Sequence, residues 1–151
     1  MLLKGDILAN ADTPVGELAL QPAVCVADVS TLAEVAATME QAKISAVLVG
    51  DTTLRIFTER DLTRALAARS GPDTRAIDAA SPNVVVAAPN LPLGRAAASM
   101  VRRGIRHLPV VDAGGVVIGM LGLDAVFRIL LREPDLSDWV AEFDGVVADG
   151  G

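Results

Sequence analysis

The chain has 151 residues, of which 52% are hydrophobic and 21% are charged. This length suits one domain or two small repeats that share a core, and the composition predicts a folded protein rather than a disordered one. The 13 basic and 19 acidic residues give a net charge of −6. That balance argues against general binding to nucleic acids or anionic membranes, because both require phosphate-neutralising lysines and arginines.

The negative charge is concentrated at the C-terminus. Residues 133–151 hold six acids and no base, so residues 1–132 carry 13 acids and 13 bases. Within that body, residues 1–75 sum to −3 and residues 76–132 sum to +3. The acidic total therefore describes a tail, and the two halves of the body have opposite charge bias.

The single cysteine, Cys25, excludes an intrachain disulfide and a cysteine-rich zinc site. It lies in a strand-like run over residues 23–26, where we expect a small buried side chain rather than a reactive thiol. The N-terminus is too short and too polar for a signal peptide, and no stretch approaches the ~18 apolar residues of a membrane span. We expect a cytoplasmic protein.

A 14-residue extension precedes the first predicted unit, residues 15–68. The unit begins with a strand over 24–26. A helix follows, with apolar residues at i, i+3, i+4 and i+7 from Leu32 to Met39, and Thr31 with Glu34 suits a capping box at its start. The rest of the unit has the order strand, turn, strand, helix, predicted at 46–49, 51–53, 54–57 and 59–68.

A second unit, residues 76–132, follows a linker at 69–75. A shift of 61 positions places Leu32 on Leu93 and Met39 on Met100, and the offset becomes 63 after the next turn. Pro92 suits the first turn of the second unit's helix. Its predicted strand, helix, strand, turn, strand and helix fall at 84–87, 93–103, 108–111, 112–115, 116–121 and 123–132. Two copies are too few for a solenoid, so we expect a pseudo-twofold pair in which each unit covers the other's apolar face.

The tail over residues 133–151 has its own pattern. Leu136, Trp139, Val140 and Phe143 recur at i, i+3, i+4 and i+7 on an acidic background, which predicts a short amphipathic helix. Packing against its own module is the simplest interpretation. Docking of a partner and packing across a dimer are the alternatives.

Three runs carry a resemblance to a known family: KISAVLV at 43–49, IFTERDL at 56–62 and GIRHLPVVD at 104–112. Over about residues 15–132 the chain resembles a pair of cystathionine-beta-synthase (CBS) domains, the tandem arrangement called a Bateman module. It is most similar to small stand-alone proteins with two such domains and no attached enzyme or channel. The resemblance implies an α/β (α+β) fold of two β-α-β-β-α repeats packed about a pseudo-twofold axis.

Thr58 and Asp61 stand where a strand gives way to a helix. Helix N-termini present unpaired N–H groups and a positive dipole end, which favour phosphate. The same residues suit an N-cap with an acidic third position, which stabilises a helix by about 1 kcal/mol without any ligand, and both roles can coexist. The resemblance implies a cleft for an adenosine nucleotide such as AMP, ADP or ATP. In that cleft Thr58 would hold the phosphate or ribose, Asp61 would accept hydrogen bonds from ribose hydroxyls, and Arg60 belongs to the same motif.

Four further residues are candidates for the same cleft. The resemblance implies that Ser45 and Ala46 border the adenine, whereas an ordinary strand entrance is the alternative. It also implies that Arg106 and His107 face the cleft and reach a phosphate, for which the donor fork of arginine is suited. A partly buried strand residue is the equal alternative for His107. The preceding Arg102–Arg103 suits the negative end of a helix dipole.

The two copies differ at corresponding positions. Arg55 stands where the family usually has glycine, so it either adds a phosphate partner or obstructs the cleft. The second copy keeps that glycine as Gly119, but it has Gly122 in place of the hydroxyl residue and is one residue short before Asp124. Asp124 is therefore a doubtful ligand-binding residue, and we expect at most one good site per chain.

No nucleophile–base pair and no metal-ligand cluster is visible in the sequence, so we expect a regulatory module with no catalytic residue and no metal. The first hypothesis is a homodimeric sensor of an adenosine nucleotide that changes shape on binding. The alternative is a ligand-free structural or interaction module that uses the fold and the tail for dimerisation or for docking a regulated protein. Neither hypothesis involves nucleic acid or a membrane.

Overall fold

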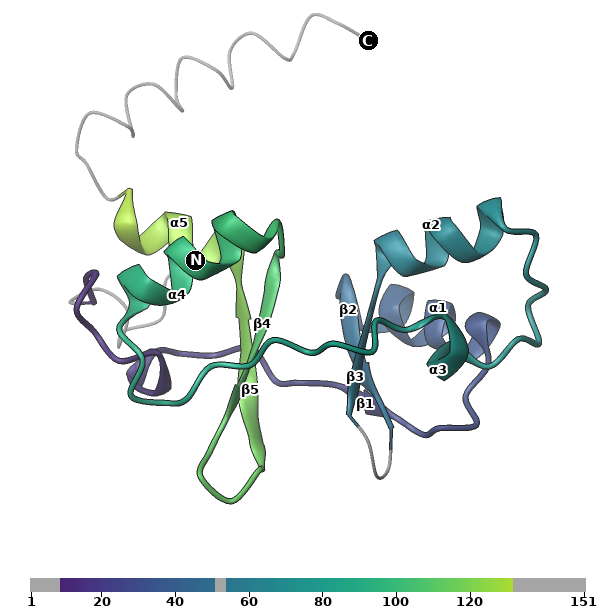
Figure 1. Cartoon of the computed structure of the whole chain (residues 1–151), viewed down its shortest axis with the longest axis horizontal. Coiled ribbons are helices and arrows are strands. Elements are labelled where there is room, and N and C mark those ends of the chain that lie inside the picture. The colour runs from purple at the N-terminus through teal and green to yellow at the C-terminus, as the bar shows by residue number, and fades with distance from the viewer. Residues whose placement is uncertain (1–8, 51–53, 132–151) are drawn as a thin grey trace, which may run out of the picture.

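The computed structural model describes residues 9–50 and 54–131. Within them the fold is mixed α+β, with two small sheets and their helices arranged as two halves side by side (Figure 1). Two extended segments run between the halves in opposite directions. The predicted turn at 51–53 and the predicted tail helix lie outside the described residues.

The first half is built on a three-stranded sheet. Strand β1 (Cys25–Val26) runs parallel to β2 (Ala46–Val49), and β2 pairs antiparallel with β3 (Arg55–Thr58). Its helices are α1 (Leu32–Ala42), α2 (Glu59–Ala67) and α3 (Ala76–Ala79). The predicted strands and the two long helices are confirmed with shifts of one residue or so at their ends. The short helix α3 is an addition that the sequence did not predict.

The second half repeats this plan with one strand fewer. It contains a 3₁₀ turn, η1, and then a helix, a hairpin and a helix: η1 (Val15–Glu17), α4 (Leu93–Arg103), β4 (His107–Val111), β5 (Val117–Gly122) and α5 (Leu123–Leu130). The predicted strand over 84–87 is wrong, because only a single parallel bridge joins Ala87 to Val110.

Pro109 explains this missing strand. In the first half, the N–H of Leu48 donates to the carbonyl of Val24 at 2.8 Å. Pro109 occupies the position equivalent to Leu48 and has no N–H to donate, so the corresponding ladder bond to Val85 cannot form. Its carbonyl still accepts from the N–H of Ala87 at 2.9 Å, which leaves one bridge in place of a strand.

Local capping follows the predicted signals at α1. The N–H of Glu34 donates to Thr31 Oγ1 at 3.2 Å, and the N–H of Thr31 donates to Glu34 Oε2 at 2.8 Å, which confirms the capping box. Helix α4 ends at Gly104, whose φ of 64° suits glycine. Pro92 immediately precedes α4 as its N-cap residue rather than lying in its first turn.

Each half is completed by a segment that leads into the other repeat. The N–H of Leu32, at the start of α1, donates to the carbonyl of Thr74 at 2.9 Å. The N–H of Leu93, at the start of α4, donates to the carbonyl of Thr13 at 2.9 Å. These two bonds are related by the 61-residue offset. The residues just before η1 therefore brace α4, and the residues just before α3 brace α1.

The hydrophobic cores show the same exchange. Val15 and Leu18 are buried in the cluster that also contains Met100, Leu108 and Val126 of the second half. Conversely, Ala76 and Ala80 are buried in the cluster of the first half: Leu32, Val35, Met39, Val47, Val49, Phe57 and Ala65. The core of the second half thus includes residues that come before β1, and the core of the first half includes residues that come before α4.

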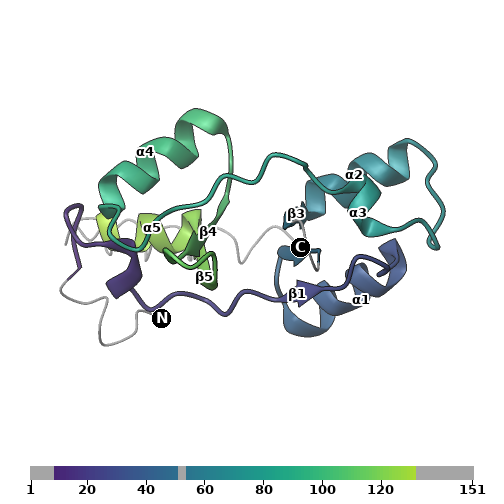
Figure 2. The same ribbon diagram turned by 60° about the horizontal axis from the view of Figure 1, so that its bottom comes forward.

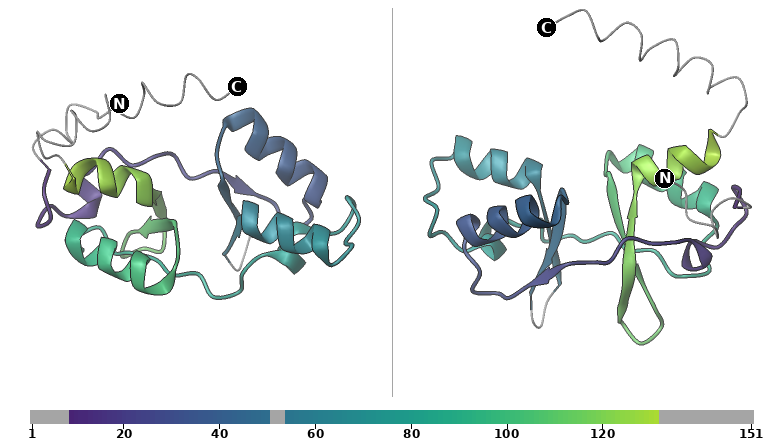
Figure 3. Two further views of the ribbon diagram at one scale, coloured as in Figure 1. Left: turned by 90° about the horizontal axis from the view of Figure 1, so that it is seen from above. Right: turned by 180° about the vertical axis from the view of Figure 1, so that it is seen from behind.

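The paired helices lie together in each half, α4 beside α5 and α2 near α3 (Figure 2). Seen from above, the helices of the two halves form separate groups, and the two extended segments cross between them (Figure 3). No helix within residues 9–50 and 54–131 is long and apolar enough to cross a membrane.

The expectation of a buried Cys25 is wrong, because its side chain is exposed. Side chains alternate between the two faces of a strand. Val24 and Val26 pack against the core of the first half, so Cys25 between them points to the opposite face.

Candidate functional site

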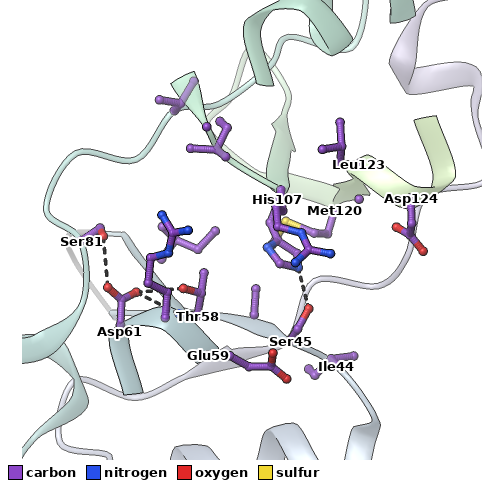
Figure 4. A pocket seen from close by; sticks show the side chains of 18 of the residues that line it. Ile44, Ser45, Thr58, Glu59, Asp61, Ser81, His107, Met120, Leu123 and Asp124 are labelled. Atoms are coloured by element: carbon purple, nitrogen blue, oxygen red, sulfur yellow. Dashed lines mark hydrogen bonds between the residues drawn. The ribbon is translucent and has the colours of Figure 1, made fainter. Parts of the chain in front are cut away.

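A cavity of about 630 Å³ opens between the two halves, where the entrances of β2 and β4 and the starts of α2 and α5 come together. All eight residues singled out in the sequence line this cleft: Ser45, Ala46, Thr58, Arg60, Asp61, Arg106, His107 and Asp124. In Figure 4, Thr58 and Asp61 lie on the opposite side of the cleft from Met120 and Asp124. The cleft is therefore built from both repeats.

Asp61 is the buried charged group of this cleft, with a side chain only 3% exposed. Its Oδ2 accepts a hydrogen bond from the backbone N–H of Thr58 at 2.9 Å, and its Oδ1 accepts from Arg64 Nη1 at 3.0 Å. Two hydroxyls make longer contacts with the carboxylate, Thr58 Oγ1 at 3.4 Å and Ser81 Oγ at 3.5 Å. The carboxylate thus accepts two hydrogen bonds of ordinary length, from the Thr58 N–H and Arg64, and two longer hydroxyl contacts.

The strand entrances and the helix starts are tied together by equivalent backbone bonds. The N–H of Glu59 donates to the carbonyl of Ser45 at 3.2 Å, and the N–H of Leu123 donates to the carbonyl of Arg106 at 2.9 Å. Each bond brings the first residue of a helix against the residue before a strand. The predicted helix-start and strand-entrance residues are therefore neighbours in space.

The single histidine has a partner from the other repeat, which sequence alone did not reveal. Ser45 Oγ and His107 Nε2 are 2.7 Å apart, in a partly buried contact (Figure 4). Burial lowers the pKa of His107 below its ordinary value of 6.5, and the positive charge of Arg106 lowers that pKa further. The negative charges of Asp124 and Glu59 raise the pKa of His107 and oppose these two effects in part. Burial therefore favours the neutral form of the imidazole.

The cleft is more basic than the chain as a whole. Its lining includes five basic side chains, Lys43, Arg60, Arg64, Arg103 and Arg106, and three acidic ones, Glu59, Asp61 and Asp124. The net positive charge lies on residues 76–132, yet three of the five bases that line the cleft come from the first half. Ser81 and Arg64 were missed, although the i,i+3 spacing of Arg64 from Asp61 is a signal for an ion pair on a helix.

The equivalent position in the second half is arranged differently. Thr58 pairs with Ala46, and Gly122 pairs with His107, so Gly122 occupies the place of Thr58. Asp124 is therefore the second residue of its helix, whereas Asp61 is the third. Its carboxylate pairs with Arg128 at 3.1 Å and is 58% exposed.

Asp124 also fills the place of the missing hydroxyl side chain. A Cβ at position 122 would lie 2.5 Å from Asp124 Oδ1. The space that Thr58 uses in the first half is therefore occupied in the second half by a carboxylate that already has a cationic partner.

Arg55 follows neither of the two predicted alternatives. Its Nη1 donates to the carbonyl of Ile77 in α3 at 3.2 Å, and it does not line the cleft. The glycine at the equivalent position, Gly119, has a different reason to be small. A Cβ there would lie 2.5 Å from Leu20 Cβ, because the segment that crosses between the halves passes directly over β5.

Among the residues that the structure describes, no group of three or more His, Cys, Asp or Glu side chains is placed to hold a metal ion. The Ser45–His107 pair has the spacing of a nucleophile and a base. No hydrogen bond within the described parts of the chain orients the other ring nitrogen, Nδ1. The basic side chains that line the cleft suit the binding of a polar, anionic molecule.

Comparison with known proteins shows that the fold of this chain occurs in other proteins. The crystallised CBS domain protein PAE2072 from Pyrobaculum aerophilum, complexed with AMP, has a TM-score of 0.69 and 26% sequence identity, covering 85% of this chain and 98% of that one. The cytosolic domain of the Mg²⁺ channel MgtE, in complex with ATP, has a TM-score of 0.66 and 27% identity over 79% of this chain, and the match covers 49% of that chain.

The uncharacterized protein MK0525 of Methanopyrus kandleri is 30% identical over 120 residues, which is 76% of this chain and 61% of that protein. The chain thus spans less than two thirds of the length of this curated relative. The CBS domain model matches twice, over residues 15–68 and 76–132. These two matches cover most of the sequence, and they show that the chain belongs to the CBS domain family.

Proposed function

We propose that this protein is a regulatory module that binds an adenosine nucleotide, AMP, ADP or ATP, in the cleft between its two repeats. It acts in the cytoplasm as a homodimer and signals by a change of conformation. The observation that carries the proposal is the Asp61 carboxylate. It is held at the start of α2 within a cavity of about 630 Å³ that has five basic side chains around it.

The hydrogen bonds of Asp61 suit a ribose. Ribose offers two hydroxyl donors, and the carboxylate holds two hydroxyl contacts of 3.4 and 3.5 Å, from Thr58 and Ser81, that are longer than good O–H···O bonds. Ligand hydroxyls replace these weak contacts while the bonds from the Thr58 N–H and Arg64 stay in place. The ribose is thus bound without dismantling the start of the helix.

The remaining lining supports positions for the base and the phosphate of the nucleotide. The base lies beside Ser45 and Ala46, where small side chains leave room for a flat ring. The phosphate lies toward Arg106 and His107, where it meets a guanidinium fork. The two related structures are complexes with AMP and with ATP, which supports a nucleotide as the ligand of this chain.

A single site per chain follows from the asymmetry of the repeats. Gly122 provides no hydroxyl, and the Asp124 carboxylate fills the adjoining space with Arg128 as its partner. A nucleotide at that position would have to break an existing ion pair.

Isothermal titration calorimetry with AMP, ADP and ATP tests the proposal. We expect one nucleotide per chain, and we expect Asp61→Asn to weaken binding at least tenfold, because a neutral amide is a poorer acceptor for two ribose hydroxyls. Asp124→Asn is the matched control and should leave the affinity within about twofold. Absence of binding by all three nucleotides at millimolar concentration would overturn the proposal. Light scattering that shows a monomer at high micromolar concentration would overturn the dimer.

A further inference from the structure

The contact between Ser45 and His107 joins the two repeats at the floor of the cleft. Ser45 precedes β2 of the first half, and His107 opens β4 of the second. Their 2.7 Å contact links side chains that lie 62 positions apart in the sequence. Because both residues line the cleft, a ligand that enters it meets this contact directly.

We propose that the binding of an anion in this cleft is coupled to the uptake of a proton by His107. The inference rests on the proposed function, because it concerns the regulation of the same site. It makes the module responsive to pH as well as to nucleotide. Three features of the described residues support the coupling: the hydrogen-bond partner of the imidazole, the charges that face it and the burial of its ring.

The partner permits either charge state. A serine hydroxyl can donate to an unprotonated ring nitrogen or accept from a protonated one. Ser45 Oγ therefore stays bonded to Nε2 whether His107 is neutral or charged. The imidazole can gain a proton without losing the contact between the two repeats.

The surrounding charges decide which state is populated. Arg106 precedes His107 and disfavours the imidazolium, whereas Asp124 from α5 and Glu59 from α2 favour it. Burial of the ring is the larger cause, and together with Arg106 it depresses the pKa of His107 in the ligand-free protein. A phosphate beside Arg106 neutralises the adjacent guanidinium charge and itself attracts the imidazolium. Both changes raise the pKa of His107.

The direction of the pH effect follows from linkage. When a ligand raises the pKa of a protein group, the protein takes up a proton as the ligand binds. The affinity for the ligand therefore increases as the pH falls through the interval between the pKa of the bound protein and that of the free protein. A rise of one pKa unit corresponds to a tenfold gain in affinity at low pH relative to high pH. We expect an effect of this size between about pH 8 and pH 5.

The chain is well suited to a direct measurement, because His107 is its only histidine. NMR titration of the His107 Cε1–H resonance from pH 5 to 8.5 reports its pKa without an assignment problem. The titration is made on the full chain with no ligand, with AMP, with sodium sulfate and with adenosine. Sulfate keeps a constant charge across this range, whereas the phosphate of AMP itself titrates near pH 6.

We expect AMP and sulfate each to raise the pKa of His107, and adenosine to leave it unchanged. If AMP shifts other resonances while the His107 titration is unmoved, the coupling is overturned and the nucleotide site stands. If AMP shifts nothing while sulfate raises the pKa, the coupling stands and the proposed nucleotide function falls. If neither ligand has any effect, both are overturned.

Affinity measurements with a variant provide an independent check. His107→Gln keeps a polar group that can bond to Ser45 but cannot be charged. The ratio of AMP affinities, wild type over variant, should rise about tenfold from pH 8 to pH 5, and the titration of AMP itself cancels in that ratio. A ratio that is independent of pH would contradict the coupling. Arg95 is an exposed arginine of α4 outside the cleft. For Arg95→Gln, the ratio of wild-type to variant affinity should stay near one at every pH.

Discussion

The structural role of Asp61 can be separated by substitution from the ligand-binding role proposed for it. In the ligand-free protein its carboxylate accepts from the Thr58 N–H and from Arg64, and the side chain is 3% exposed. Replacing Asp61 by alanine removes the acceptor and leaves the Thr58 N–H without a side-chain partner. Loss of an N-terminal cap costs about 1 kcal/mol, and an unsatisfied, partly buried donor costs about 1–3 kcal/mol.

These two costs overlap, since they describe the same hydrogen bond. The ion pair with Arg64 adds little because the arginine side chain is 63% exposed. We therefore expect Asp61→Ala to lower the free energy of unfolding by about 2 kcal/mol. For a chain of this size the melting temperature should fall by roughly 4–8 °C. Asp61→Asn keeps an oxygen acceptor for the Thr58 N–H and should cost less than about 1 kcal/mol.

Thermal and urea denaturation of the purified, ligand-free variants provide the assay. Asp124→Ala is the matched control, because that carboxylate also lies in the first turn of a helix and pairs with an arginine, but both side chains are more than half exposed. We expect it to cost under about 1 kcal/mol. Equal losses for Asp61→Ala and Asp124→Ala, or equal losses for the alanine and asparagine variants at position 61, would refute the reasoning.

Three further predictions concern packing and pH. Gly119→Ala should lower the free energy of unfolding by about 1–3 kcal/mol, because the new Cβ would meet Leu20; Gly71→Ala, in open space, should be neutral in the same denaturation assay. Val15→Ala should cost about 2 kcal/mol, and hydrogen exchange should show the loss of protection first in the second half, whose core contains Val15. Uniform loss across both halves would contradict that assignment. The pKa of His107 is lower in the folded state than the unfolded value of about 6.5. Its contribution to stability should therefore be present above about pH 6.5 and be lost as the pH falls through the folded pKa, and His107→Gln should flatten this dependence.

The long elements could be predicted from the sequence because their signals are local. The apolar stripe from Leu32 to Met39 and the capping box at Thr31 each involve residues within one or two turns, and α1 begins and ends close to where they place it. Helix α3 could not be predicted, since four residues show no helical period. The prediction of a strand over 84–87 was wrong because the ladder of that strand depends on the N–H of a residue far along the chain. That residue is Pro109, which has no N–H.

The candidate site was predictable in its members but not in its contacts. Repeated motifs identified Thr58, Asp61 and His107, and all three line the cleft. The contact of His107 with Ser45 depends on how two repeats meet across the pseudo-twofold axis, which no local pattern encodes. The contact of Ser81 with Asp61 could not be predicted either, because Ser81 lies in the segment that crosses between the two halves.

The exchange of segments between the halves bears on whether one repeat can fold alone. One repeat alone lacks the strip of backbone that braces its first helix, as the bonds from Leu32 to Thr74 and from Leu93 to Thr13 show. A polypeptide with a single repeat would therefore be complete only if two copies exchanged their leading residues. If the chain is divided between the repeats, neither fragment should fold when it is expressed alone. Co-expression of the two fragments should restore the fold.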